Sequence, residues 1–86
     1  MERLPDHPAN EVDSREALVS HILRLRDDFL ERGDEWENPT LERYLEALAA
    51  WIKASPGWYR NFDQEMPADG DWTFFARALS AAVVYE

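Results

Sequence analysis

Three stretches of the chain carry apolar residues at helical spacing. The first is expected to begin at Asp13, which can cap free amides while Glu16 reaches back to the Asp13 amide, and to end near Gly33. Leu18, Ile22, Leu25 and Phe29 recur at four-and-three spacing on one face, and Val19, Leu23 and Leu30 lie about 100° further round the helix. They form an unusually wide apolar arc. A helix that touches two neighbours at once needs such an arc, so the pattern favours a helical bundle over a two-layer sheet protein.

The segment EWENPTLERYLEALAAW, residues 35–51, predicts the second helix. Asn38 is a cap residue, and Pro39 follows it at the first helical position, where a missing amide costs nothing. The apolar residues after it form one stripe: Leu41, Tyr44, Leu45, Leu48, Trp51 and Ile52. The run Ser-Pro-Gly at residues 55–57 is expected to end this helix.

Residues 55–66 have two interpretations. Ser55 and Pro56 can cap a short fourth helix that carries Trp58, Tyr59 and Phe62, whereas the Pro67 and Gly70 that follow are typical of a loop. The pattern leaves both open.

The third helix is expected to begin at the cap residue Asp71 and to continue to Glu86. One face carries Trp72, Phe75, Ala76, Leu79, Ala82 and Val83, and a second face carries Phe74, Ala78 and Tyr85. A helix that is apolar almost all round is usually buried on several sides, so we expect this one at the centre of the bundle. A strand over residues 81–86 would have no pairing partner in the sequence.

The length and the residue types favour one small globular domain. The chain has 86 residues with 45% hydrophobic residues and four tryptophans, which suffices for a single core. Residues 1–12 have little to bury and are predicted to be a flexible, disordered tail, whereas residues 13–86 are predicted to be the domain. The expected fold is therefore an all-α, compact three-helix bundle, with the short fourth helix left open.

The absence of cysteine removes both disulfides and thiolate metal sites, and it fits a reducing compartment. The first residues lack the apolar run of a secretory signal, and no stretch approaches the roughly 18 apolar residues of a membrane span. We therefore expect a cytoplasmic protein without a membrane partner.

The charge is strongly acidic and unevenly distributed. The net charge is −9, which disfavours nucleic acid and favours a basic protein partner. Residues 27–46 hold eight acidic side chains against two arginines, so an acidic pole surrounds the second helix start.

Candidate chemistry is sparse. His7 and His21 have no acidic or cysteine neighbour at ligand spacing, so neither a zinc site nor a triad is predicted. The carboxylate pairs at 27/31 and 42/46 lie one helical turn apart, but the Glu-x-x-His motif of di-metal bundles is missing, and a solvated face explains them better. The sequence predicts no enzyme, no metal and no cofactor.

Arg26 projects into the apolar arc of the first helix, between Val19 and Ile22. Two interpretations stay open. Its stem lies along the core with the guanidinium outside, or it forms a structural ion pair, for example with Glu86.

The segments DSREA, EWENPTLERYLEALAAWI and GWYRN, with the ending W..FA..L.AA..YE, together resemble a family of small bacterial domains of unknown function. The resemblance spans nearly everything from residue 13 to 86. It implies short, acidic, single-domain proteins without established activity, so it transfers no catalytic residues. A weaker likeness, over about residues 35–51, is to small acidic inhibitors of the barstar type, whose folds include strands that this pattern does not predict.

The leading functional hypothesis is a protein-interaction module, of inhibitor or immunity type, that binds an unknown basic protein. Its candidate partner-binding residues are Asp34, Glu35, Trp36, Glu37, Trp58 and Tyr59. Trp36 can instead fold back over the second helix, and Trp58 and Tyr59 can belong to the core. The alternative hypothesis is a structural, homodimeric domain without enzymatic activity. Its candidate self-association residues are Phe74, Ala78 and Tyr85.

Overall fold

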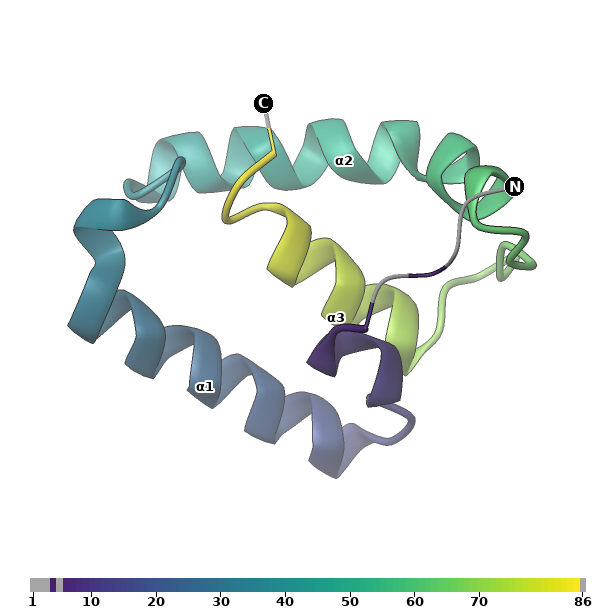
Figure 1. The fold of residues 1–86 in the computed structure, drawn as a ribbon, viewed down its shortest axis with the longest axis horizontal. Helices are drawn as coiled ribbons and strands as arrows, with labels where there is room; N and C mark the ends of the chain where they lie inside the picture. Colours follow the sequence, from purple (N-terminus) through teal and green to yellow (C-terminus); the bar gives the residue numbers. More distant parts are fainter. Residues whose placement is uncertain (1–3, 5, 86) are drawn as a thin grey trace.

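The chain folds into three α-helices joined by short connections (Figure 1). The structure, a computed structural model, describes residue 4 and residues 6–85. The helices are α1 (Arg15–Arg32), α2 (Leu41–Asn61) and α3 (Trp72–Ala81), and the 3-10 helices η1 (Pro8–Glu11) and η2 (Gly33–Glu35) flank α1. None of the described residues belongs to a strand, so the predicted all-α bundle is confirmed.

The start of α1 lies one residue later than predicted. Ser14, and not Asp13, is the cap, because the Ala17 N–H donates to the Ser14 hydroxyl at 3.1 Å. The helix ends at Arg32, and Gly33 continues in right-handed helical geometry (φ −59°) rather than in the left-handed C′ conformation. A Cβ at Gly33 would lie 2.7 Å from the Phe29 ring. The glycine is therefore needed for the close approach of this ring.

The α2 helix begins two residues later than the sequence pattern indicates. Thr40 is its cap, with the Arg43 N–H donating to the Thr40 hydroxyl at 3.2 Å, so Pro39 lies outside the helix. Asn38 has a different partner, the end of α3, as described below.

The predicted stop at residues 55–57 is wrong, because α2 continues through Pro56 to Asn61. Proline lacks the N–H that would donate to the carbonyl four residues earlier, here that of Ile52. The Ser55 hydroxyl donates to this carbonyl at 2.7 Å and replaces the lost bond. The aromatic residues after Pro56 therefore belong to α2, and no separate fourth helix forms among residues 55–66.

The central position of α3 is confirmed, since it packs against α1, α2 and η1. Asp71 caps it as predicted, with the Phe74 N–H donating to the carboxylate at 2.7 Å. The helix is shorter than predicted and ends at Ala81, while residue 86 lies outside the described residues. In Figure 1, α3 crosses the space between α1 and α2.

The core consists of two clusters on α3. The larger one joins α2 to α3 through buried Trp51, Tyr59, Phe74 and Ala78. The smaller one joins η1 to α3 through buried Ala9, Val12 and Ala76.

The smaller cluster modifies the prediction of a flexible tail over residues 1–12. Residues 1–3 and 5 lie outside the described residues, but η1 packs on α3. The Thr73 hydroxyl donates to the Val12 carbonyl, and Arg77 Nε donates to the Asn10 side chain at 2.8 Å. Ala9 and Val12 are too few to give a visible hydrophobic pattern in the sequence. They hold η1 on α3 because they pack against Ala76.

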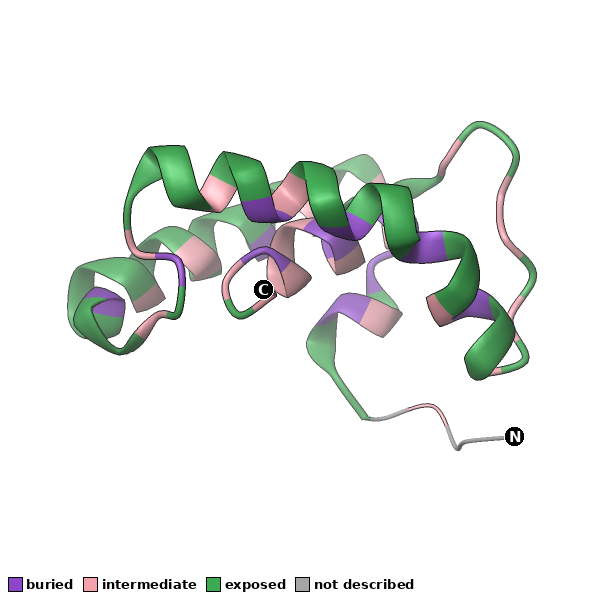
Figure 2. Cartoon of the chain, turned by 90° about the horizontal axis from the view of Figure 1, so that it is seen from above, coloured by how far each residue is buried: buried purple, intermediate pink, exposed green. Residues whose placement is uncertain are grey.

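A large part of the apolar arc of α1 remains at the surface. Among the 18 residues of α1, His21 is buried, whereas Val19, Ile22, Leu23, Phe29 and Leu30 are exposed. Figure 2 shows the resulting long exposed faces of the helices. The prediction that α1 touches two helices along this arc is wrong, because α1 packs on α3 and has little direct contact with α2. No helix among the described residues is both long and apolar enough to cross a bilayer.

Candidate functional site

An open apolar groove of about 410 Å³ lies between α1 and α2. Its α1 wall includes Ile22 and Phe29, its α2 wall includes Leu41 and Tyr44, and Leu79 of α3 lies between them. Trp36 and Pro39, from the connection between α1 and α2, also line it. The groove is therefore formed by all three helices, and the described residues leave it unfilled.

Each wall of the groove extends into a row of exposed apolar side chains. The α1 row consists of Val19, Ile22, Leu23, Phe29 and Leu30, and the α2 row consists of Leu41, Leu45 and Ile52. Leu30 is 76% exposed and Leu41 is 74% exposed. Both rows span eleven residue steps, or about 16 Å of helix. Contiguous exposed apolar surface of this kind is typical of binding sites.

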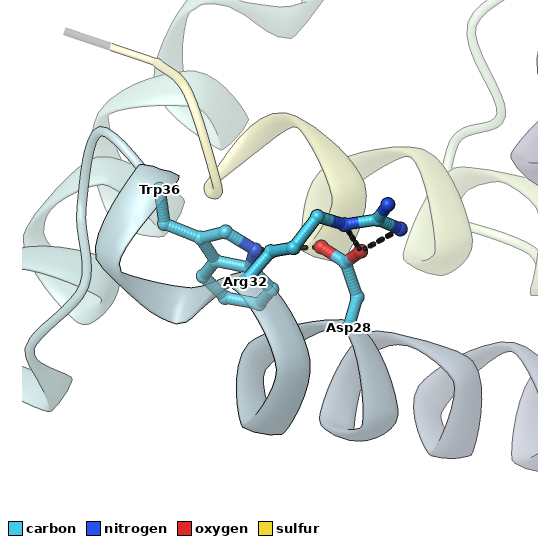
Figure 3. A network of polar contacts seen from close by, with 3 residues as sticks. All are labelled: Asp28, Arg32 and Trp36. Atoms are coloured by element: carbon cyan, nitrogen blue, oxygen red, sulfur yellow. Dashed lines mark hydrogen bonds and ion pairs between the residues drawn. The ribbon is translucent and has the colours of Figure 1, made fainter.

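A polar network fixes Trp36 at one end of the groove (Figure 3). The Trp36 indole N–H donates to Asp28 Oδ2 at 2.7 Å, and Arg32 donates to Asp28 Oδ1 from Nε at 3.1 Å and from Nη2 at 2.7 Å. The indole hydrogen bond, followed by the Arg32 contacts, lowers the pKa of Asp28. The Trp36 ring contacts the edge of Phe29 at 5.2 Å and stacks on Tyr44 at 6.1 Å between ring centroids. Trp36 is thus folded back onto α1 and α2.

The same connection holds the C-terminal end of α3. The Asn38 side-chain amide donates to the carbonyls of Ala82 at 3.0 Å and Tyr85 at 2.7 Å, and the Asn38 backbone N–H donates to Val83 at 3.1 Å. These three carbonyls belong to the segment that follows α3, which ends at Ala81. Asn38 therefore fixes the position of α3 relative to the start of α2.

Tyr44 adds a further link between α2 and α3. Its hydroxyl donates to the Leu79 carbonyl at 2.7 Å, and burial raises the pKa of this hydroxyl. The floor of the groove is therefore held by hydrogen bonds as well as by packing.

Carboxylates lie beyond the two apolar rows, outside the lining of the groove. Asp27 lies four residues after Leu23 and three before Leu30, so it stands at the outer edge of the α1 row. Glu42 lies three residues before Leu45, at the outer edge of the α2 row. The connection at the Trp36 end adds exposed Asp34, Glu35 and Glu37.

Among the described residues that line the groove, Arg26 is the one basic residue. Its side chain is 61% exposed and donates to Asp27 Oδ1 from Nε at 3.1 Å and from Nη2 at 2.9 Å. Neither sequence interpretation holds in full. The apolar arc around Arg26 lies at the surface and not in the core. The ion pair joins Arg26 to its neighbour Asp27, and Glu86, the partner suggested from the sequence, lies outside the described residues.

The structure does not bring the predicted partner-binding residues into one surface. The three carboxylates at 34, 35 and 37 are exposed, but Tyr59 is 2% exposed and Trp58 packs half-buried against the larger core cluster, with the Arg77 guanidinium 4.9 Å from its ring centroid. Trp58 also lies 17 residues after the start of α2, about 25 Å along the helix from the Trp36 end. The alternative reading of Trp58 and Tyr59 as core residues describes their positions better.

The predicted self-association face is mostly internal. Phe74 is 7% and Ala78 is 3% exposed, and Tyr85 is half-buried against the same cluster. Eight of the eleven exposed large apolar side chains among the described residues lie instead on the two rows. Sequence reasoning missed it because the wide arc of α1 was assigned wholly to the core.

His21 and Ser80 form a contact that the sequence does not indicate. His21 Nε2 lies 2.6 Å from the Ser80 hydroxyl, and His21 is 4% exposed. Burial, followed by the nearby charges of His7 and Arg24, lowers the pKa of His21. Among the described residues, His21 Nδ1 bonds to no carboxylate of the kind that orients the histidine in a Ser-His-Asp triad. We interpret the pair as a packing contact between α1 and α3.

The described residues contain no cluster of three or more histidine and acidic side chains that could hold a metal ion. The carboxylate pairs at 27/31 and 42/46 are exposed, as the sequence indicates.

The fold and the groove define a small all-helical domain with one central helix and an open apolar surface. Residues 14–86 match the model of a family described as "Family of unknown function (DUF7660)", and the chain belongs to this family. Comparisons with curated proteins and with solved structures give no match.

Proposed function

We propose that this protein is a protein-interaction module that binds a basic segment of another protein in the groove between α1 and α2. The observation that carries the proposal is the pair of exposed apolar rows with carboxylates along their outer edges. Such a surface combines apolar contact area at its centre with charge at its rim, as protein interfaces do.

The lining of the groove supports a protein partner over a small substrate. Arg26 is its one charged side chain, and the other lining side chains are almost all apolar or aromatic. A substrate site usually adds several convergent polar groups to an apolar pocket, and a catalytic one adds a base and a nucleophile. We therefore propose a binding role without catalysis.

The charge supports a basic partner. A net charge of −9 attracts cationic surfaces, and the carboxylates at the outer edges of the two rows would pair with lysine or arginine beside them. If the bound segment is part of the partner's own working surface, binding inhibits that partner. This is the inhibitor or immunity role expected from the sequence.

Self-association is the second candidate, because two copies could cover each other's rows. The acidic edges oppose it, since a dimer would bring two sets of carboxylates together. Gel filtration with light scattering distinguishes the two, because a monomer at high concentration contradicts the homodimer.

Affinity capture from the host with three matched baits tests the proposal. The baits are the wild-type protein, Leu41→Glu in the α2 row, and Val84→Glu, which is also exposed but lies outside the groove lining. We expect proteins that wild type and Val84→Glu retain, that Leu41→Glu loses, and that are released when salt rises from about 0.1 M to about 0.5 M. Identical sets from all three baits would contradict the proposal.

A further inference from the structure

We infer that the occupant of the groove is a single amphipathic α-helix of about three turns, basic at its flanks, with one carboxylate placed against Arg26. This inference rests on the proposed function and specifies the partner segment. With this helix bound, the domain becomes a four-helix bundle.

The geometry of both walls fits a helix. In α2, the exposed residues Leu41, Leu45 and Ile52 follow steps of four and seven residues, which places them on one face that another helix can pack against. Both walls are helices, and none of the described residues offers a strand edge for an extended peptide. The eleven-residue span of each row sets the length of the occupant at about 16 Å, or three helical turns.

The space for a fourth helix follows from the arrangement of the other three. Both outer helices pack on α3 and have little direct contact with each other, and the open groove lies between them. Leu79 supplies the floor, and Phe75, one turn earlier on α3, is 43% exposed on the same side. A helix laid along the groove would touch all three helices.

The charge distribution decides which helix is bound. Asp27 and Glu42 lie outside the groove lining, beyond the two rows, and one oxygen of Asp27 is already paired with Arg26. A helix that covered both rows would have Glu42 beside one flank and the other oxygen of Asp27 beside the opposite flank. Lysine or arginine at the flanks would pair with these edges, whereas a second copy of this chain would bring its own net charge of −9. The occupant is therefore a basic helix from another protein.

Arg26 sets the register of this helix. It lies four residues after Ile22 and three before Phe29, within the α1 row, and its hydrogen bonds go to a single oxygen of Asp27. A bound helix would remove water from the guanidinium. The pair with Asp27 uses the Nε and Nη2 donors, so the other N–H groups would need an acceptor on the bound helix. A guanidinium can donate two parallel hydrogen bonds to a carboxylate. One glutamate or aspartate of the occupant would therefore face Arg26.

A peptide selection tests the inference without knowledge of the natural partner. The probe is a displayed library of random 14-residue peptides, selected on the wild-type protein and counter-selected on Leu41→Glu. We expect the surviving peptides to carry apolar residues at three-and-four spacing, a net positive charge, and one acidic residue in a fixed place. Arg26→Gln should weaken their binding by about tenfold or more. Selection on Arg26→Glu should replace the acidic residue with lysine or arginine.

The outcomes separate the inference from the proposed function. If the surviving peptides tolerate proline at their centre, or show no helical spacing, the bound segment is not a helix, and the groove remains a binding site. If no peptide depends on Leu41, both fail. Unchanged affinity with Arg26→Gln would overturn the role of Arg26. Sedimentation velocity adds one outcome: a micromolar dimer that Leu41→Glu converts to a monomer would make a second copy the occupant and overturn the inference. Circular dichroism checks that each variant is folded.

Discussion

Asn38 shows how one side chain connects distant parts of the chain. Its amide and backbone N–H donate to three carbonyls at the end of α3, although it lies 44 residues before Ala82 in the sequence. The Asn-Pro pair looks like a helix start because cap residues and turn residues have the same chemistry. The sequence could not reveal that the acceptors come from another helix.

Asn38→Ala should destabilise the protein. The substitution leaves buried carbonyls without their donors, and the free energy of unfolding is expected to fall by about 1–3 kcal/mol. Urea unfolding followed by tryptophan fluorescence measures this change. Glu37→Ala, an exposed neighbour in the same connection, should change the stability by less than about 0.5 kcal/mol. Equal effects of the two substitutions would contradict the assigned role of Asn38.

His21 should make the stability depend on pH. Burial lowers its pKa in the folded protein from the ordinary value of 6.5, so the unfolded chain binds a proton more readily. The contribution of His21 is then fully present above about pH 6.5 and is lost as the pH falls, with a limiting slope of about 1.4 kcal/mol per pH unit. Asp28, whose pKa is lowered, loses its contribution only at more acidic pH, below its ordinary value of 3.8.

Unfolding free energies measured between pH 7.5 and about pH 5 check the effect of His21, with His21→Gln as the matched variant. The glutamine keeps a polar group near Ser80 but does not titrate. The variant should lack most of the slope in this range. A slope that persists unchanged in His21→Gln would assign it to other groups.

At the scale of whole elements, the helix centres were easier to predict than their ends. The structure confirms Asp71 as the cap of α3. The cap of α1 lies one residue after the predicted position, and the cap of α2 lies two residues after it. The largest error was the stop at Pro56. A proline inside a helix is disfavoured in general, and a serine hydroxyl that replaces the missing bond is visible only in three dimensions.

A double-mutant cycle at Ser55 and Pro56 tests this explanation. Ser55→Ala should lower the free energy of unfolding by about 1 kcal/mol, because the Ile52 carbonyl loses its donor. In a Pro56→Ala background, the new backbone N–H can donate to the same carbonyl, so Ser55→Ala should cost less by about 0.5 kcal/mol or more. If urea titrations show that the two substitutions have additive effects on the free energy of unfolding, the Ser55 hydroxyl does not replace the missing backbone hydrogen bond.

For the molecule as a whole, the sequence predicted the fold class but not the site. Periodicity shows which residues share a face of a helix, but it cannot show whether the fold provides a neighbour for that face. Leu30 and Leu41 belong to good helical patterns and are nevertheless among the most exposed apolar residues of the described chain. The acidic charge was visible in the sequence, whereas its arrangement along the two rows depends on how α1 and α2 are placed.

The central claim is that the groove is open in the free protein. Methyl NMR with a soluble paramagnetic probe tests it directly, at a concentration where the protein is monomeric. The methyl groups of Ile22, Leu41, Leu45 and Ile52 should be broadened, as those of the exposed Val84 are, while those of buried Val12, outside the groove, remain protected. If the methyl groups of the two rows are protected like those of Val12, α1 and α2 close over each other, and the proposed binding surface does not exist.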